Sequence, residues 1–166
     1  MRLSAKAALL AACAFALPAA AQDLSSQRDY ADPAQRDRPI ACKPGDIEKF
    51  PGKSLGEVFG ADWPKVNGSQ RATARLLEHG PIRWPAGLDP QHSFTVVAVL
   101  VDAAGEPVRA EVLCTTRMGL DAAVRRHALA STYAPAMVDG RPVAAPLVRV
   151  VSVRTQAREV APRPRR

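Results

Sequence analysis

The stretch LDAAVRRHALASTYAPAMVDGRPV, residues 120–143, decides the fold that the sequence predicts. Its first half carries apolar side chains at helical spacing, with His127 at the edge of the stripe, which predicts a short amphipathic helix over residues 120–130. Those apolar side chains are Leu120, Ala123, Val124 and Ala128. Pro135 prevents the helix from resuming, and Asp139-Gly140 predicts a tight turn before a run of valines. A helix is therefore expected to lead through an extended stretch into a final strand.

Two strands are expected before this helix and one after it. SFTVVAVLV, residues 93–101, is rich in β-branched and apolar residues, and apolar side chains fall on both of its faces, so both faces are expected to be partly covered. The turn 102–105 leads to VRAEVLCTT, residues 108–116, in which apolar and polar residues alternate. In this second strand we expect Val108, Ala110, Val112 and Cys114 to point inward and Arg109, Glu111 and Thr115 to point outward. APLVRVVSVRT, residues 145–155, is expected to be the third strand.

This order of elements predicts an α+β fold with two layers. A two-stranded hairpin alone is marginally stable, so one helix must pack on one face of a small antiparallel sheet of β-β-α-β order, around a single core. We expect the last strand to lie at an edge of that sheet, with unpaired backbone N–H and C=O groups. An irregular, short-helical segment is expected to precede this domain.

The first 21 of the 166 residues have the features of a secretory signal peptide. Arg2 and Lys6 give a positive start, and Ala19-Ala20-Ala21 offers a cleavage site before Gln22. The apolar run between them has about 11 residues, whereas a membrane-spanning helix needs roughly 20. We therefore expect the protein to be periplasmic, with no spanning helix in the mature chain.

Two other fates of the N-terminus stay open at this point. The signal could be retained as an inner-membrane anchor. Alternatively, Leu10-Ala11-Ala12-Cys13 has the form of a lipoprotein box, in which Cys13 would carry a lipid. Either attachment would make the protein a membrane-attached envelope structural protein or an energy transducer.

The ends of the mature chain are polar. Residues 22–41 offer almost nothing to bury, which predicts a flexible leader, and residues 156–166 predict a basic, disordered tail. The full chain has a net charge of +7, and loss of the signal with its two basic residues leaves +5. A basic tail could touch anionic lipid or nucleic acid. Because an exported protein rarely meets nucleic acid, no nucleic-acid partner is expected.

Two cysteines remain in the mature chain, Cys42 and Cys114. In an oxidising compartment an even pair favours a disulfide, which here would close a loop of about 70 residues. In the chain-entropy view such a bridge stabilises the fold by on the order of 4 kcal/mol. The alternative is two unpaired thiols, one of them buried in a strand.

Residues 42–92 predict an irregular segment, rich in turns, that packs on the domain or precedes it. A short helix is expected at about 70–79, with Ser69 as its cap, Gly80-Pro81 as its end, and Leu76 and Leu77 buried. Trp63 and Trp84 both precede proline, which favours an extended backbone. Such a Trp-Pro pair either seals the edge of a core or forms a shelf for a ligand.

Residues 93–155 resemble the C-terminal domain of the TonB family. Three segments carry the resemblance, in the family's order and at its spacing. VDAAGEPVRAEVLCTT is similar to the family's V-D-x-x-G hairpin, LDAAVRRHALASTYAPA to its L-D-x-A-A helix with a following aromatic-x-Pro, and VDGRPVAAPLVRVVSV to its D-G-[KR]-P-V loop and final strand.

The resemblance implies a periplasmic module that binds proteins and takes part in transport across the envelope, and it implies no enzyme activity. Family members bind extended segments of outer-membrane receptors by adding a strand to their sheet, and an open sheet edge supplies the main-chain hydrogen bonds for this. The edge expected to bind a protein or peptide partner carries Leu147, Arg149, Val151 and Val153. An open edge also permits pairing between copies of the chain, so a homo-oligomer is possible in principle.

An enzyme is the competing class of function. His79, His92 and His127 are scattered without metal-ligand spacing, and the sequence has no nucleophile elbow and no glycine-rich phosphate loop. A Cys-His pair, such as Cys114 with His127, is a catalytic arrangement that the residue types allow. We expect no catalytic, metal-binding or cofactor-binding residues, and hence no cofactor.

Overall fold

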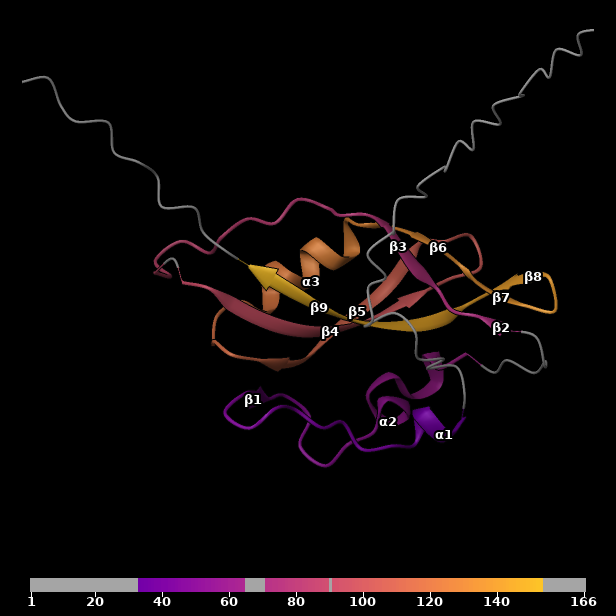
Figure 1. Ribbon diagram of the computed structural model, residues 1–166, viewed down its shortest axis with the longest axis horizontal. Coiled ribbons are helices and arrows are strands. Elements are labelled where there is room, and N and C mark those ends of the chain that lie inside the picture. Colours follow the sequence, from indigo (N-terminus) through magenta and orange to yellow (C-terminus); the bar gives the residue numbers. More distant parts are fainter. Residues whose placement is uncertain (1–32, 65–70, 90, 154–166) are drawn as a thin grey trace, which may run out of the picture.

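The computed structural model describes residues 33–64, 71–89 and 91–153 (Figure 1). The expected signal peptide, the first part of the leader and the basic tail lie outside the described residues. The helices are α1 (Pro33–Arg36), α2 (Leu55–Phe59), the 3-10 turn η2 (Gly60–Asp62) and α3 (Asp121–Leu129). The strands are β1 (Ile47–Glu48), β2 (Arg71–Ala72), β3 (Arg75–Glu78), β4 (Ser93–Val101), β5 (Pro107–Thr115), β6 (Thr132–Ala134), β7 (Ala136–Val138), β8 (Arg141–Val143) and β9 (Ala145–Val153).

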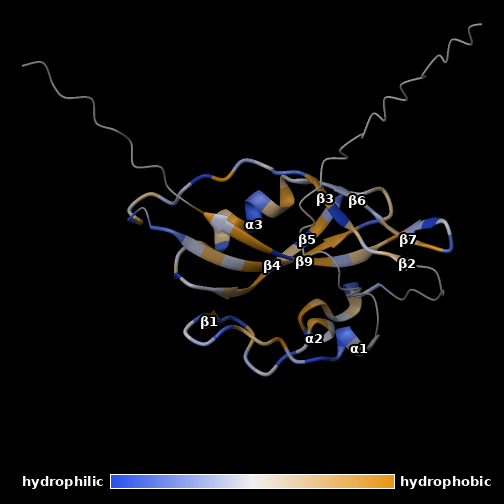
Figure 2. Cartoon of the chain, viewed as in Figure 1, coloured by the Kyte–Doolittle hydropathy of each residue, from blue (hydrophilic) through white to orange (hydrophobic). Residues whose placement is uncertain are grey.

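The main sheet has four antiparallel strands in the order β1-β5-β4-β9. The central strand β4 pairs with β9 along its whole length, from Ser93 opposite Val153 to Val101 opposite Ala145. Helix and small antiparallel sheets together confirm the predicted α+β class. Hydrophobic residues concentrate in the strands of this sheet and in α2 (Figure 2).

Helix α3 covers one face of the sheet (Figure 1). Its buried side packs on the odd-numbered residues of β4, and the contact forms the larger of two core clusters. At the start of the helix, Asp121 makes a 2.6 Å ion pair with Lys49, in addition to its favourable place at the positive end of the helix dipole. Near its end, the Tyr133 hydroxyl donates a 2.8 Å hydrogen bond to the Ala128 carbonyl, which satisfies one carbonyl of the last turn.

The second face of the sheet is covered by the chain between residues 39 and 63 (Figure 1). Helix α2 begins with a capping box, in which Ser54 and Glu57 bond each other's backbone N–H. Phe59 and Trp63 are buried against the even-numbered residues of β4, and their rings meet edge to face at 6.2 Å. The sheet therefore has a layer on each face, one more than the predicted two-layer fold, and Trp63 seals a core instead of forming a shelf.

The prediction of a helix at about 70–79 is wrong. Two short strands, β2 and β3, occupy this region and pair with β7 and β6. Leu77 is 57% exposed, so the two leucines do not form one buried helical side. Pairing with the strands that follow α3 satisfies the backbone of this segment, and that tertiary contact decides against the weak helical pattern.

The predicted flexible leader is too long at its C-terminal end. Residues 33–36 form α1, and Pro39 makes an isolated bridge with Ser54. The Ile40 amide donates to the Lys53 carbonyl, and the Ile40 side chain packs on the second core cluster. The end of this polar stretch is therefore held on the sheet by backbone contacts and by one apolar side chain.

The in-out pattern predicted for residues 108–116 is only partly correct. Val108 is 56% exposed, whereas Thr115 is fully buried and shares a 3.1 Å hydrogen bond with Thr95. A bulge places the extra residue Leu113 between the partners of Val96 and Val97, and this turns Cys114 to the face that α2 covers.

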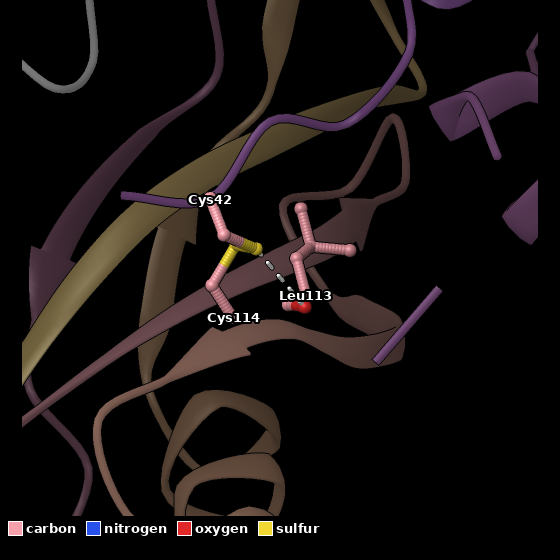
Figure 3. The surroundings of a disulfide bond; sticks show 3 residues. All are labelled: Cys42, Leu113 and Cys114. Carbon is pink, nitrogen blue, oxygen red and sulfur yellow. Dashed lines mark hydrogen bonds between the residues drawn. A yellow bond between two sulfur atoms is a disulfide. The ribbon is translucent and has the colours of Figure 1, made fainter. Parts of the chain in front are cut away.

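The disulfide between Cys42 and Cys114 is present, as predicted (Figure 3). It joins residues 72 apart in the sequence, and their Cα atoms lie 5.7 Å apart. The Cys42 sulfur also lies 3.8 Å from the Leu113 carbonyl oxygen. The bridge therefore ties the N-terminal layer to the bulged end of β5.

The remaining strands make the passage from α3 to β9. Tyr133 enters the extended stretch β6, as predicted, and β7 and β8 form a hairpin. Asp139 and Gly140 form its turn, with φ angles of 47° and 76°. Positive φ at both central residues is the geometry of the hairpin turns that favour Asp-Gly. Among the described residues, none of the helices has the length and apolar character to cross a membrane.

Candidate functional site

Strand β9 forms one edge of the main sheet. In the described chain its only strand neighbour is β4. The opposite edge, at β5, is paired with β1 over just two residues, Ile47 and Glu48. Strand β9 is nine residues long and unpaired along its outer side, which makes it the longest open edge among the described strands.

The backbone groups that β9 directs outward follow from the contacts of β4. Phe94 donates its N–H to Thr116 Oγ1 and accepts the Thr116 N–H with its carbonyl, so both of its backbone groups face β5. Successive residues of a strand direct these groups to opposite sides. The odd-numbered residues of β4 therefore direct their backbone groups toward β9. Their partners in β9 are also odd-numbered and direct their backbone groups toward β4.

The even-numbered residues of β9 consequently direct their backbone groups away from the sheet. They are Pro146, Val148, Val150 and Ser152. Pro146 has no N–H, and within a sheet proline is confined to edge strands and to positions whose N–H would face outward. The outer edge thus offers three N–H donors and four carbonyl acceptors to a visiting strand.

The side chains predicted to form the edge site turn inward. Leu147, Val151 and Val153 belong to the core beneath α3, and Arg149 is buried on the same face. The exposed side chains of β9 are instead Val150, which is 49% exposed, and Ser152. Neither residue was predicted from the sequence, although strict alternation from a buried Leu147 would have identified Val150.

A groove with a volume of about 400 Å³ runs beside the C-terminal half of β9. One side consists of Arg149 to Ser152, and the other consists of residues 79–82 together with His127 of α3. Because Val150 and Ser152 line it, the groove opens onto the outward-facing part of the backbone. The edge is therefore accompanied by a recess on the side of α3.

Segment 79–82 is held against the end of α3 by two hydrogen bonds, and a third fixes the Ser131 hydroxyl that takes part in one of them. His127 Nδ1 lies 2.7 Å from the Gly80 carbonyl, the Gly80 amide donates to Ser131 Oγ at 2.9 Å, and that hydroxyl donates to the His127 carbonyl at 2.8 Å. A Cβ at Gly80 would lie 2.5 Å from the Ala130 carbonyl carbon. Glycine is thus required for this close approach, and the groove has a fixed wall.

The groove contains two histidines and one arginine. The rings of His79 and His127 stack with centroids 5.9 Å apart, and Arg149 Nη2 lies 3.0 Å from His79 Nδ1. Burial lowers the pKa of His127, and the nearby Arg149 charge acts in the same direction. A carbonyl can only accept, so His127 donates from Nδ1 to Gly80 and its ring is held in one tautomer.

No catalytic arrangement is formed by the residue pair that the sequence allowed. Cys114 is oxidised in the disulfide and faces α2, whereas His127 lies on the α3 face of the sheet. His92 makes other contacts: its Nε2 lies 3.0 Å from Ser152 Oγ, and its ring packs edge to face with that of Phe94. Within the described ranges, no three His, Cys, Asp or Glu side chains gather as a metal site would require.

Comparison with protein-family models gives no match for this chain, and comparison with curated proteins gives none either.

Proposed function

We propose that the protein is a periplasmic, TonB-like binding module that takes up an extended segment of an envelope protein as an added strand on β9. The observation that carries the proposal is the open outer edge of β9, with its outward backbone groups at Val148, Val150 and Ser152. The export signal expected at residues 1–21 supplies the compartment.

The order of elements supports the same proposal. Strands β4 and β5, helix α3 and strand β9 follow one another in the chain as the TonB resemblance implies, with β6 to β8 between the helix and the last strand. The helix covers the face of the sheet next to the groove, and this leaves the outer edge of β9 to the partner.

Strand addition at this edge predicts a modest affinity. Each main-chain hydrogen bond contributes about 0.5–1.5 kcal/mol net, and association and ordering of the peptide oppose this gain. Side chains that fall on alternate faces of the added strand would reach Val150 on one face and the groove on the other. Backbone pairing thus gives affinity for any extended peptide, while the contacts with Val150 and with the groove give selectivity.

The test is titration of the mature chain, residues 22–166, with synthetic extended segments of outer-membrane receptors. We expect binding in the micromolar to millimolar range, with amide NMR shifts largest at Val150 and Ser152. A scrambled peptide rich in proline, which cannot pair along an edge, is the matched control. No binding at millimolar peptide, or shifts confined to other elements, would overturn the proposal.

A further inference from the structure

Arg149 is a buried charge without a carboxylate. Its side chain is 5% exposed and lies on the α3 face of β9, between Leu147 and Val151 of the core. Nη2 bonds His79, but Nη1 is buried and has no hydrogen-bond partner in the structure. None of the ion pairs found between described residues includes Arg149.

Such an arrangement is costly to the free protein. A buried charge is normally paired, and an unpaired one loses its hydration without return. Arg109, on the other face of the sheet, has more hydrogen-bond partners although its side chain is 35% exposed: it bonds Asp62 and Glu111 and also the carbonyls of Val58 and Phe59. Arg149 is more deeply buried, and the hydrogen bond of its side chain is with His79 and not with a carboxylate.

The neighbouring groups do not neutralise it. A guanidinium has donors only, so His79 Nδ1 must be the acceptor of their 3.0 Å bond and carries no proton. His127 Nδ1 is committed to the Gly80 carbonyl. The groove therefore holds the formal positive charge of Arg149 beside two imidazole rings, neither of which supplies a negative charge.

The position of Arg149 in β9 places this charge next to any added strand. Directly opposite residues on one face of paired strands have Cβ atoms about 5 Å apart. A visiting strand on the outer edge of β9 would thus direct one side chain of its α3 face toward Arg149, through the groove that Arg149 lines. The guanidinium has N–H groups left over for that side chain.

We propose that the groove selects, within the docked segment, a carboxylate side chain that lies opposite Arg149 and pairs with its guanidinium. This inference rests on strand addition at β9, as proposed above, and specifies the chemistry of the partner: an extended segment with an aspartate or glutamate on the side facing α3. His79 and the rim of segment 79–82 shield the pair from water, which strengthens it.

A different role for Arg149 gives the opposite expectation. Charges that point inward from an edge strand can protect the edge, because they discourage pairing with other strands. If that were its role, replacing Arg149 by an uncharged residue would strengthen the binding of all extended peptides. Under the carboxylate proposal, the same change weakens binding of acidic peptides alone.

The first experiment places a single glutamate at each position of an uncharged Thr/Val nonapeptide and measures binding to the mature chain. We expect glutamate to increase affinity on the order of tenfold over glutamine at alternate positions and to do nothing at the positions between them. Lysine at the favoured positions should abolish binding. Equal affinity for glutamate and glutamine throughout would overturn the proposal while leaving strand addition intact.

The second experiment compares Arg149→Gln with Arg126→Gln, which removes an equal charge from the exposed side of α3. Arg149→Gln should abolish the glutamate preference, and Arg126→Gln should keep it. Because Arg149→Gln could fail to fold, its far-UV circular dichroism is recorded first, and the peptide scan on the unaltered protein stands without it. A general gain of affinity in Arg149→Gln would assign the edge-protecting role instead.

The third experiment uses acetate alone, followed by NMR of the Arg149 and His79 side chains. Saturable shifts at both residues, absent with Arg149→Gln, are expected. If acetate shifts these groups while no peptide binds, the anion site stands and strand addition fails. If neither acetate nor any peptide produces an effect, both are wrong.

Discussion

At the residue scale, His127 is a buried side chain that fixes one wall of the groove. It is 4% exposed, and its Nδ1–H is donated to the Gly80 carbonyl. The sequence placed His127 at the edge of the helical stripe, which is correct, but the stripe could not reveal the partner 47 residues away. Ser131 also has a partner far away in the sequence, because its hydroxyl accepts the Gly80 N–H and donates to the His127 carbonyl.

A dependence of stability on pH follows from the lowered pKa of His127. Its ordinary pKa is about 6.5, and burial lowers that of the folded protein. The unfolded chain therefore takes up a proton before the folded protein does, and the contribution of the neutral ring is complete above pH 6.5. It is lost as pH falls from there to the lowered pKa, by at most about 1.4 kcal/mol per pH unit.

The measurement is the free energy of unfolding in urea between pH 7.5 and 4.5, for the unaltered protein and for His127→Gln. Glutamine can still donate to Gly80 but does not titrate. We expect the difference between the two proteins to shrink or change sign as pH falls. A difference that stays constant over this range would show that His127 does not titrate in folding.

At the element scale, the position of a strand in the sheet was easier to predict than the direction of its side chains. The valine-rich segment 145–155 predicts a strand, and β9 covers residues 145–153 of it. Its edge position is also predicted, and in the described chain β4 is the one strand that pairs with it. Arg149, however, is predicted from the sequence as one of the partner-binding side chains of the edge, and the structure instead buries it on the α3 face.

Two proline substitutions in β9 distinguish the N–H groups that point outward from those that bond β4. Val150→Pro removes an outward N–H, so we expect folding to be retained and peptide binding to fall by at least about tenfold. Val151→Pro removes an N–H that bonds β4 and should lower the free energy of unfolding by about 1–3 kcal/mol. Urea unfolding and peptide titration of both variants check this. Equal destabilisation by the two prolines would contradict the assigned direction of the backbone.

At the scale of the whole molecule, the sheet is covered on one face by a segment that precedes β4 and β5 in the chain and on the other by a helix that follows them. Helix α3 covers one face, and residues 39–63 cover the other (Figure 1). The sequence predicted the first layer from helical spacing. The second rests on Trp63 and on Leu55, Val58 and Phe59 of α2. The three residues of α2 do have helical spacing, but the helix is five residues long and lies between turns, so the pattern covers a single turn and was not recognised in the sequence.

The disulfide is expected to hold this second layer in place. Reduction of Cys42–Cys114 should lower the free energy of unfolding by about 4 kcal/mol, because it frees a loop of 72 residues in the unfolded chain. Urea unfolding with and without reductant measures the effect, and the double variant Cys42→Ser, Cys114→Ser should not respond to reductant. Free thiols in the unreduced protein would contradict the bridge.

Amide hydrogen exchange of β9, measured by NMR in the free mature chain and with a bound extended peptide, tests strand addition most directly. In the free protein, Arg149 and Val151 should already be protected by β4, while Val150 and Ser152 should exchange quickly. Peptide binding should slow Val150 and Ser152 by at least about tenfold and leave the other two unchanged. Protection that appears on β5 or α2 instead, with Val150 and Ser152 unaffected, would contradict docking at the outer edge of β9.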